Sequence, residues 1–168
     1  MNFNNFTIKS QEAVQQAIQL VQNRGQQAIE AEHLLAGVLK VGENVTNFLF
    51  QKLGMNGPQI ANVLDKQIAS LPKVTGGEPY LSRTSNEVLQ KSVELSKGLG
   101  DEYVSLEAML LALLSVKSTA STILKDAGMN EKDLRTAINE LRQGQKVTSQ
   151  SSEDTYRSLS KYAINLIE

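Results

Sequence analysis

The sequence contains no cysteine, no tryptophan and a single histidine. Without cysteine, a chain forms no disulfide, thiolate metal site or cysteine nucleophile, and such a composition fits a reducing compartment. A metal or general-base site would have to use His33, which has no partner at H-x-x-x-H spacing. We therefore expect a packed or helix-capping histidine, with no metal site and no catalytic site.

An excess of charge of one sign is also missing, because 17 basic residues face 18 acidic ones and the net charge is -1. This balance argues against nucleic acid as the partner. No apolar run approaches the roughly 20 residues of a membrane helix, and the start MNFNNFTIKS does not resemble a signal peptide. By elimination we expect a cytoplasmic protein with no membrane partner. No phosphate-loop pattern G-x-x-x-x-G-K-[ST] occurs, so no nucleotide cofactor is expected in this stretch of chain.

The residues that are present favour helices, since strong helix formers dominate and glycine or proline falls between the periodic segments. Apolar residues recur at three- and four-residue steps in residues 10–24, which predicts a helix with one buried stripe. Residues 31–41 are apolar almost all round, which predicts a central helix. Further helices are expected at 45–53 and from Asn56 onward. The predicted fold class is all-α.

The same order of segments then returns along the chain. An offset of 75 residues (100 minus 25) matches identical residue types: Gly25 with Gly100, Ser10 with Ser85, Glu32 with Glu107 and Leu35 with Leu110. After a one-residue deletion, Gly-Met-Asn at 54–56 falls on Gly-Met-Asn at 128–130. This pattern predicts a tandem duplication, with about eight helices in two pseudo-symmetric four-helix repeats. Within a domain of residues 1–142, repeat one covers about 7–71 and repeat two about 82–142.

The second repeat carries its own start signals. Thr84 and Glu87 have the spacing of a capping box, and Ser105 and Asn130 can each accept a hydrogen bond from a first-turn N–H group. Residues 72–79 are rich in glycine and proline, so we expect an exposed crossover between the repeats.

The last part of the chain is predicted to fall into two pieces. Residues 143–152 are polar and lack periodic apolar residues, which predicts a flexible linker. Residues 153–168 place several apolar side chains on one helical face that needs further chain to cover it, which indicates the start of another module. The alternative is a final helix that docks back on the domain.

Several stretches together carry a family resemblance: FTIKSQEAVQQAIQLV, EHLLAGVL, YLSRTSNEVLQKSVEL, GDEYVSLEAMLLALL and YRSLSKYAINLIE. In this order they resemble the Clp N-terminal repeat family, in particular the ClpB branch of the AAA+ unfoldases. The resemblance implies a hexameric, ATP-driven disaggregase that works with the Hsp70 system. It implies that residues 153–168 begin the first AAA+ module, and that ATP and magnesium bind in modules outside this chain.

The resemblance also implies that Thr7, Asp101 and Glu107 take part in substrate handling. Each of these residues has a structural alternative. Thr7 can cap the first helix, Asp101 can hold the loop after Gly100, and Glu107 sits in a first helical turn, where the dipole favours a carboxylate.

Four apolar residues are the candidates for a shallow client-binding groove: Val88, Leu89, Met109 and Leu110. The alternative is that they belong to the core, as most residues in such stripes do. Met109 replaces the aromatic or large aliphatic residue expected at this family position, and methionine adapts to irregular apolar partners. The working hypothesis is that the groove captures exposed hydrophobic segments of unfolded or aggregated proteins, while nearby carboxylates orient segments with basic residues.

Three other functions remain open at this point. The domain could dock an adaptor protein, as in the ClpC and ClpA branches, or it could be a regulatory gate that never touches clients. Hydrolase chemistry would need paired carboxylates such as Asp101 with Glu102 or Glu30 with Glu32. Such pairs are common at solvated helix starts, and no nucleophile accompanies them, so we do not expect an enzyme.

Overall fold

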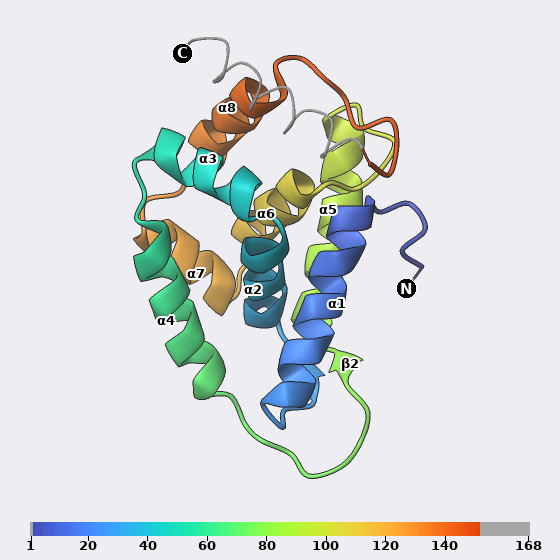
Figure 1. Ribbon diagram of the computed structural model, residues 1–168, viewed down its shortest axis with the longest axis vertical. Helices are drawn as coiled ribbons and strands as arrows, with labels where there is room; N and C mark the ends of the chain where they lie inside the picture. The colour runs from blue at the N-terminus through green and yellow to red at the C-terminus, as the bar shows by residue number, and fades with distance from the viewer. Residues whose placement is uncertain (1, 152–168) are drawn as a thin grey trace.

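The computed structural model describes residues 2–151, and in that part of the chain it contains eight α-helices and one pair of two-residue strands (Figure 1). The elements are α1 (Ile8–Asn23), β1 (Ala28–Ile29), α2 (Ala31–Val41), α3 (Glu43–Leu53), α4 (Gly57–Ala69), β2 (Tyr80–Leu81), α5 (Arg83–Gly98), α6 (Leu106–Ser115), α7 (Thr119–Asp126) and α8 (Glu131–Arg142). The all-α prediction is confirmed. No single helix among residues 2–151 meets the length and hydropathy needed to cross a bilayer, and α6 and α7 would meet them only together, across a 95° bend.

The duplication is visible in the residues that begin the helices. Thr7 caps α1 and Ser82 caps α5, each by accepting a hydrogen bond from the N–H three residues later. Asn56 and Asn130 do the same for α4 and α8. The capping box predicted at Thr84 is wrong, because α5 already begins at Arg83 and the earlier serine supplies the cap.

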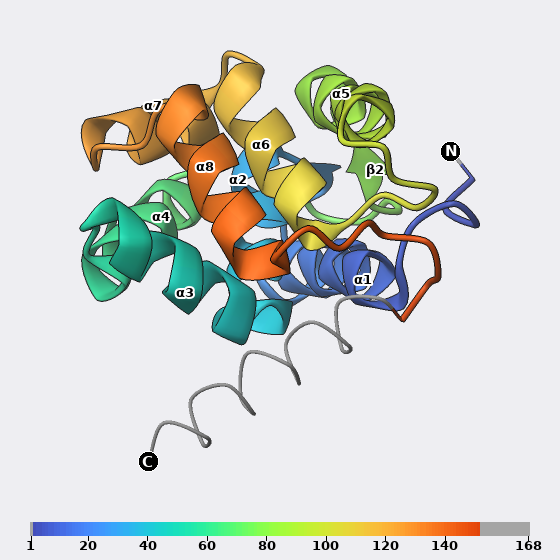
Figure 2. The same ribbon diagram turned by 90° about the horizontal axis from the view of Figure 1, so that it is seen from above.

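Helices α2 and α6 occupy the centre of the molecule, with α1 and α5 on one side and α3, α4, α7 and α8 on the other (Figures 1 and 2). Every residue of α6 from Leu106 to Leu114 is buried. At Gly37 in α2, an added Cβ would lie 2.1 Å from the carbonyl oxygen of Ala13 in α1. Glycine is therefore required there for the two helix backbones to pack this closely.

Two short parallel backbone pairings join the repeats to each other. Strand β1 of repeat one pairs in parallel with β2, which leads into repeat two, and Ile29 faces Leu81. A second, isolated parallel bridge joins Phe6 to Val104. The offset of 75 converts Phe6 to position 81 and Ile29 to position 104, so the two pairings are equivalent. Each repeat thus pairs the entry to its first helix with a loop of the other repeat.

The crossover between the repeats is exposed, whereas the segment after α8 contacts the domain. The crossover at residues 72–79 is non-helical, and Val74 is 46% exposed, as predicted. The flexible linker predicted at residues 143–152 contacts the domain at Val147 and Gln150, which differs from the free tether expected. Val147 is fully buried and its carbonyl accepts the N–H of Glu102 at 2.8 Å, while the Ile8 N–H donates to Gln150 O at 2.9 Å. The module predicted at 153–168 lies outside the described residues.

Candidate functional site

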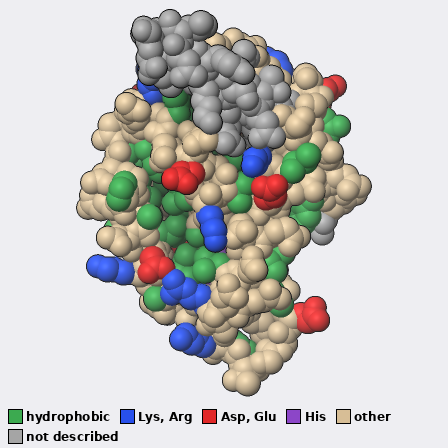
Figure 3. Space-filling view, in the orientation of Figure 1, with side chains coloured by type: hydrophobic (Ala, Val, Ile, Leu, Met, Phe, Trp, Pro, Cys, Tyr) green, Lys and Arg blue, Asp and Glu red, His purple; other side chains and the backbone are tan. Residues whose placement is uncertain are grey.

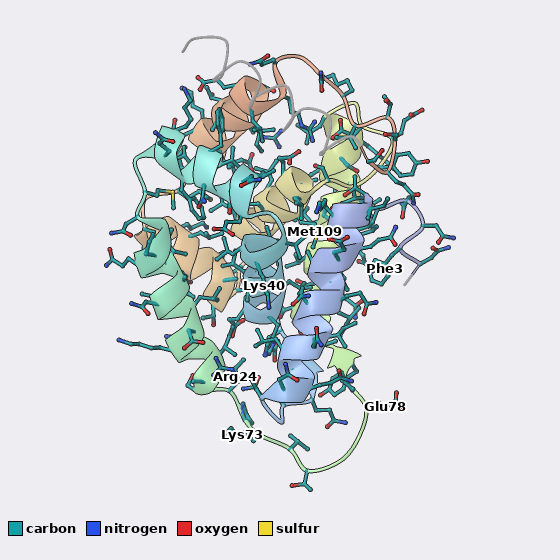
Figure 4. All side chains as sticks on the ribbon, viewed as in Figure 1. Phe3, Arg24, Lys40, Lys73, Glu78 and Met109 are labelled. Atoms are coloured by element: carbon teal, nitrogen blue, oxygen red, sulfur yellow. The ribbon has the colours of Figure 1, made fainter. Side chains whose placement is uncertain are left out.

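The four apolar residues predicted to line a groove belong to the core. Val88, Leu89 and Met109 have no exposed surface, and Leu110 is 1% exposed. The prediction of an open groove at these residues is wrong, because α5 and α6 turn these side chains toward each other and toward the central helices. Figure 4 shows Met109 inside the helical packing.

The two carboxylates implied by the resemblance meet at one arginine of α8. Arg142 Nη2 lies 2.9 Å from Glu107 Oε2, and Arg142 Nη1 lies 3.0 Å from Asp101 Oδ2. Asp101 Oδ1 also accepts the N–H of Val147 at 3.0 Å. Both carboxylate side chains have no exposed surface, and Arg142 is 4% exposed. The basic partner of these carboxylates is therefore internal, and the arrangement ties α6, α8 and the docked tail together.

Arg142 was not identified from the sequence, although a signal was available. With the offset of 74, Arg142 takes the place of Ile68, an inner-face residue of α4 in repeat one. A cation at a position that the other repeat fills with a buried aliphatic side chain indicates a buried acidic partner.

Thr7 has the capping role given above as its structural alternative. Its hydroxyl accepts the Ser10 N–H at 3.1 Å and donates to Ser10 Oγ at 2.8 Å. The side chain has no exposed surface. Its hydrogen bonds therefore stabilise the start of α1.

The expectation of a packed, capping histidine is confirmed at His33. Its Nδ1 accepts the Glu30 N–H at 2.9 Å, so its Nε2 carries the proton and donates to Gln26 Oε1 at 2.8 Å. Gln26 in turn donates to the carbonyl of Ile68 at 2.7 Å. Burial lowers the pKa of His33 to about 4, with a smaller contribution from the positive charge of Arg24.

Burial also raises the pKa of the neighbouring Glu32 carboxyl, a hydrogen bond to the backbone lowers it, and the charge of Glu30 adds to the increase. Neither His33 nor Glu32 belongs to a set of metal ligands, because the described residues contain no cluster of three or more His, Asp or Glu side chains that could hold a metal ion.

An open groove of about 560 Å³ lies between α1, α2 and α4. Its apolar surface comes from the partly exposed Leu20 of α1 and Leu39 of α2 and from the exposed Ala61 of α4. The amide side chains of Gln16, Gln19 and Asn23 line its α1 side. Figure 3 shows hydrophobic side chains gathered in this hollow, surrounded by polar surface. Apolar surface beside groups that donate and accept hydrogen bonds suits an extended polypeptide segment.

Two charged residues line this groove. Asp65 of α4 is bound by the guanidinium of Arg24, which closes one end. Lys40, in the last turn of α2, is exposed and lies between α4 and α1 in Figure 4. The sequence reasoning missed this groove, because a glutamine-rich helix face is usually read as simple solvated surface.

A second hollow of about 520 Å³ lies between α4 and α7, lined by Thr119, Thr122, Asn56, Gln59 and Val63 among others. The internal symmetry of the repeats relates the pair α4–α7 to the pair α8–α3. Between α3 and α8 lies the ion pair Lys52–Glu140 at 3.5 Å. Polar and apolar surface are about equal in this second hollow, so it offers less apolar surface to a hydrophobic segment than the groove between α1, α2 and α4.

The fold and its groove define a class of protein: a doubled α-helical repeat domain with an open surface groove, in which the described residues show no catalytic constellation. The chain belongs to the Clp repeat (R) N-terminal domain family, which matches residues 5–127.

Curated relatives align with the whole length of this chain. It is 78% identical over 168 residues to the chaperone protein ClpB of Bacteroides thetaiotaomicron and 54% identical to that of Porphyromonas gingivalis. The chain spans 20% of the length of each of these relatives. It therefore corresponds to one domain of much longer chaperones.

Solved structures share the fold. The Hsp104 N-terminal domain from Candida albicans superposes with a TM-score of 0.78 at 22% identity, covering 89% of this chain and 99% of that domain. The N-terminal domain of the ClpV1 ATPase from Escherichia coli gives a TM-score of 0.73 at 19% identity, covering 84% of this chain and 88% of that one. The doubled-repeat architecture is thus shared with distant members.

Proposed function

We propose that this chain is the client-engaging domain of a ClpB-type disaggregase and that it binds exposed hydrophobic segments of unfolded or aggregated proteins in the groove between α1, α2 and α4. The observation that carries the proposal is the open groove whose apolar surface comes from Leu20, Leu39 and Ala61, whereas the apolar residues first expected to line a groove are buried. The whole protein would be a cytoplasmic, ATP-driven hexamer that works with the Hsp70 system.

Weak binding at a single groove is sufficient for this role. A dissociation constant of tens of micromolar corresponds to about 6 kcal/mol. Tethering several domains to one ring raises their effective concentration for a client with several apolar segments. A shallow groove that releases each segment easily is compatible with handing clients to a motor.

The proposal is tested by titrating the chain with a fluorescently labelled, permanently unfolded protein such as reduced, carboxymethylated α-lactalbumin. We expect saturable binding in the micromolar range, and we expect Leu20→Glu and Leu39→Glu each to weaken it at least about fivefold, because a charge replaces apolar contact surface.

The matched control is Ile8→Glu, which alters an apolar residue of the same helix that is 47% exposed and lies outside the groove lining. This variant should bind like the original chain. Equal weakening by all three substitutions would place binding elsewhere, and the absence of binding at millimolar concentration would reject the proposed function.

A further inference from the structure

We infer that Lys40 makes the groove selective for apolar segments that also carry a carboxylate, from an aspartate, a glutamate or a chain end. This inference rests on the proposed client-binding function and specifies the class of client. It differs from the expectation drawn from the sequence, in which carboxylates of this domain would select basic segments. Those carboxylates, Asp101 and Glu107, are buried against Arg142.

The charge of Lys40 is available to a ligand. Within residues 2–151 the lysine takes part in no ion pair, and its side chain is exposed. Glu43, the nearest acidic residue along the chain, forms no ion pair with it in the described part of the protein. The carboxylate of the groove itself, Asp65, is bound by Arg24. The lining therefore presents an uncompensated positive charge.

The wider face carries charges of both signs (Figure 3). Figure 4 places Arg24 and Lys73 on the face that carries Lys40, toward the end of the groove where α4 leads into the crossover. Figure 3 also shows acidic side chains on this face, above the hollow and beside α4, and Arg24 is paired with Asp65. The preference for an acidic over a basic segment therefore comes from Lys40 itself, the charged residue of the lining that has no ion-pair partner among residues 2–151. Favourable charge at the rim of a site acts mainly on selectivity and association rate.

A single bound segment can contact the charge of Lys40 and the apolar surface of the groove at the same time, because the two are adjacent. Lys40 adjoins Leu39 in the chain, and both line the groove. An ammonium group is a point charge with three donors on a flexible stem, so it can follow a carboxylate at several positions along a bound segment. Gln16 and Gln19 on the opposite wall can bond the segment's backbone. One segment can therefore bury apolar side chains and pair its carboxylate at the same time.

The test uses two labelled peptides of identical apolar sequence that differ only in a central glutamate or glutamine. In fluorescence anisotropy at low ionic strength, we expect the glutamate peptide to bind about two- to fivefold more tightly, as for a partly exposed ion pair. The difference should shrink as salt is added. Lys40→Gln should remove the difference between the affinities for the two peptides.

Lys97→Gln is the matched control, because Lys97 is also an exposed lysine in the last turn of a helix, far from the groove lining. This variant should keep the preference for glutamate. Equal affinities for the two peptides, or a preference that survives Lys40→Gln, would overturn this inference and leave the proposed function standing. If neither peptide binds, the proposed function fails, and the inference fails with it.

Discussion

The guanidinium of Arg142 holds the carboxylate of Glu107 from two nitrogens, with Nε at 3.2 Å and Nη2 at 2.9 Å from Oε2. The same arginine bonds Asp101 and the hydroxyl of Ser105, so it joins the end of α8 to the start of α6. Two residues that family resemblance associates with substrate handling are thus part of the internal framework in this protein.

Arg142→Ala should lower the free energy of unfolding by about 3–5 kcal/mol, because it leaves two buried carboxylates without their cation. Urea denaturation followed by circular dichroism measures this change. The comparison variant Glu94→Ala removes an exposed pair with Lys91 and should cost less than about 1 kcal/mol. A loss at Arg142 as small as that at Glu94 would show that the buried pairs contribute little to stability.

Val147→Asp should release the docked tail, because it places a charge in a fully buried apolar position. The amide protons of Ile8 and Glu102, which bond to the tail, should then exchange about tenfold faster or more, since burial of a valine is worth about 1.5–3 kcal/mol. Hydrogen exchange followed by NMR measures both sites. Thr148→Asp, at an exposed neighbour, should leave them protected, and unchanged protection in both variants would contradict docking in solution.

His33 should make stability depend on pH. Its pKa of about 4 in the folded protein lies below the ordinary 6.5, so the unfolded chain takes up the proton first as the pH falls. The stability contributed by the neutral imidazole is complete above pH 6.5 and is lost as the pH falls from 6.5 toward 4. Glu32 acts in the opposite direction, because its raised pKa lets the folded protein bind a proton more readily than the unfolded chain.

The variant His33→Gln isolates the contribution of the histidine to the pH dependence of stability. At pH 7 the original chain should be more stable than the variant, and the difference should narrow on acidification toward about pH 4.5. Thermal denaturation at a series of pH values provides the measurement. A difference that stays constant with pH would mean that His33 titrates normally in the folded protein.

Gly37→Ala should destabilise the protein by about 1–3 kcal/mol, because the new methyl group would overlap the Ala13 carbonyl and push α1 away from α2. Gly98→Ala in α5 is the matched control, since a Cβ there meets no atom within 4 Å. That variant should be neutral or slightly more stable, by up to about 1 kcal/mol. Equal effects at both glycines would show that the α1–α2 contact tolerates a methyl group.

The repeat architecture could be predicted because two independent patterns agreed. Helical periodicity marked the segments, and the offset that relates Gly25 to Gly100 joined them into two equivalent sets. The helix at Ala31–Val41 has the predicted bounds, since a nearly all-apolar segment between a capping glutamate and Gly42 has few alternatives. The two-residue strands were missed, because such short pairings leave no periodic signal.

The groove could not be predicted in the same way. An apolar stripe shows which face of a helix is buried, but the partner that covers it depends on packing. Helix α6 is apolar on all sides, and Met109 is therefore enclosed rather than open to ligand. The observed groove combines apolar residues from three helices, such as Leu20 of α1 and Ala61 of α4, which no local window of sequence brings together. The docking of the tail depends on one apolar residue, Val147, in a polar stretch.

The reciprocal bridges Phe6–Val104 and Ile29–Leu81 are the contacts that a symmetric dimer of a single repeat would make with itself. Fusion through the crossover at residues 72–79 replaces that bimolecular encounter with a tethered one, so assembly of the two halves no longer depends on protein concentration. A chain severed in the crossover should consequently behave as a pair of complementary fragments, each stable only in the company of the other.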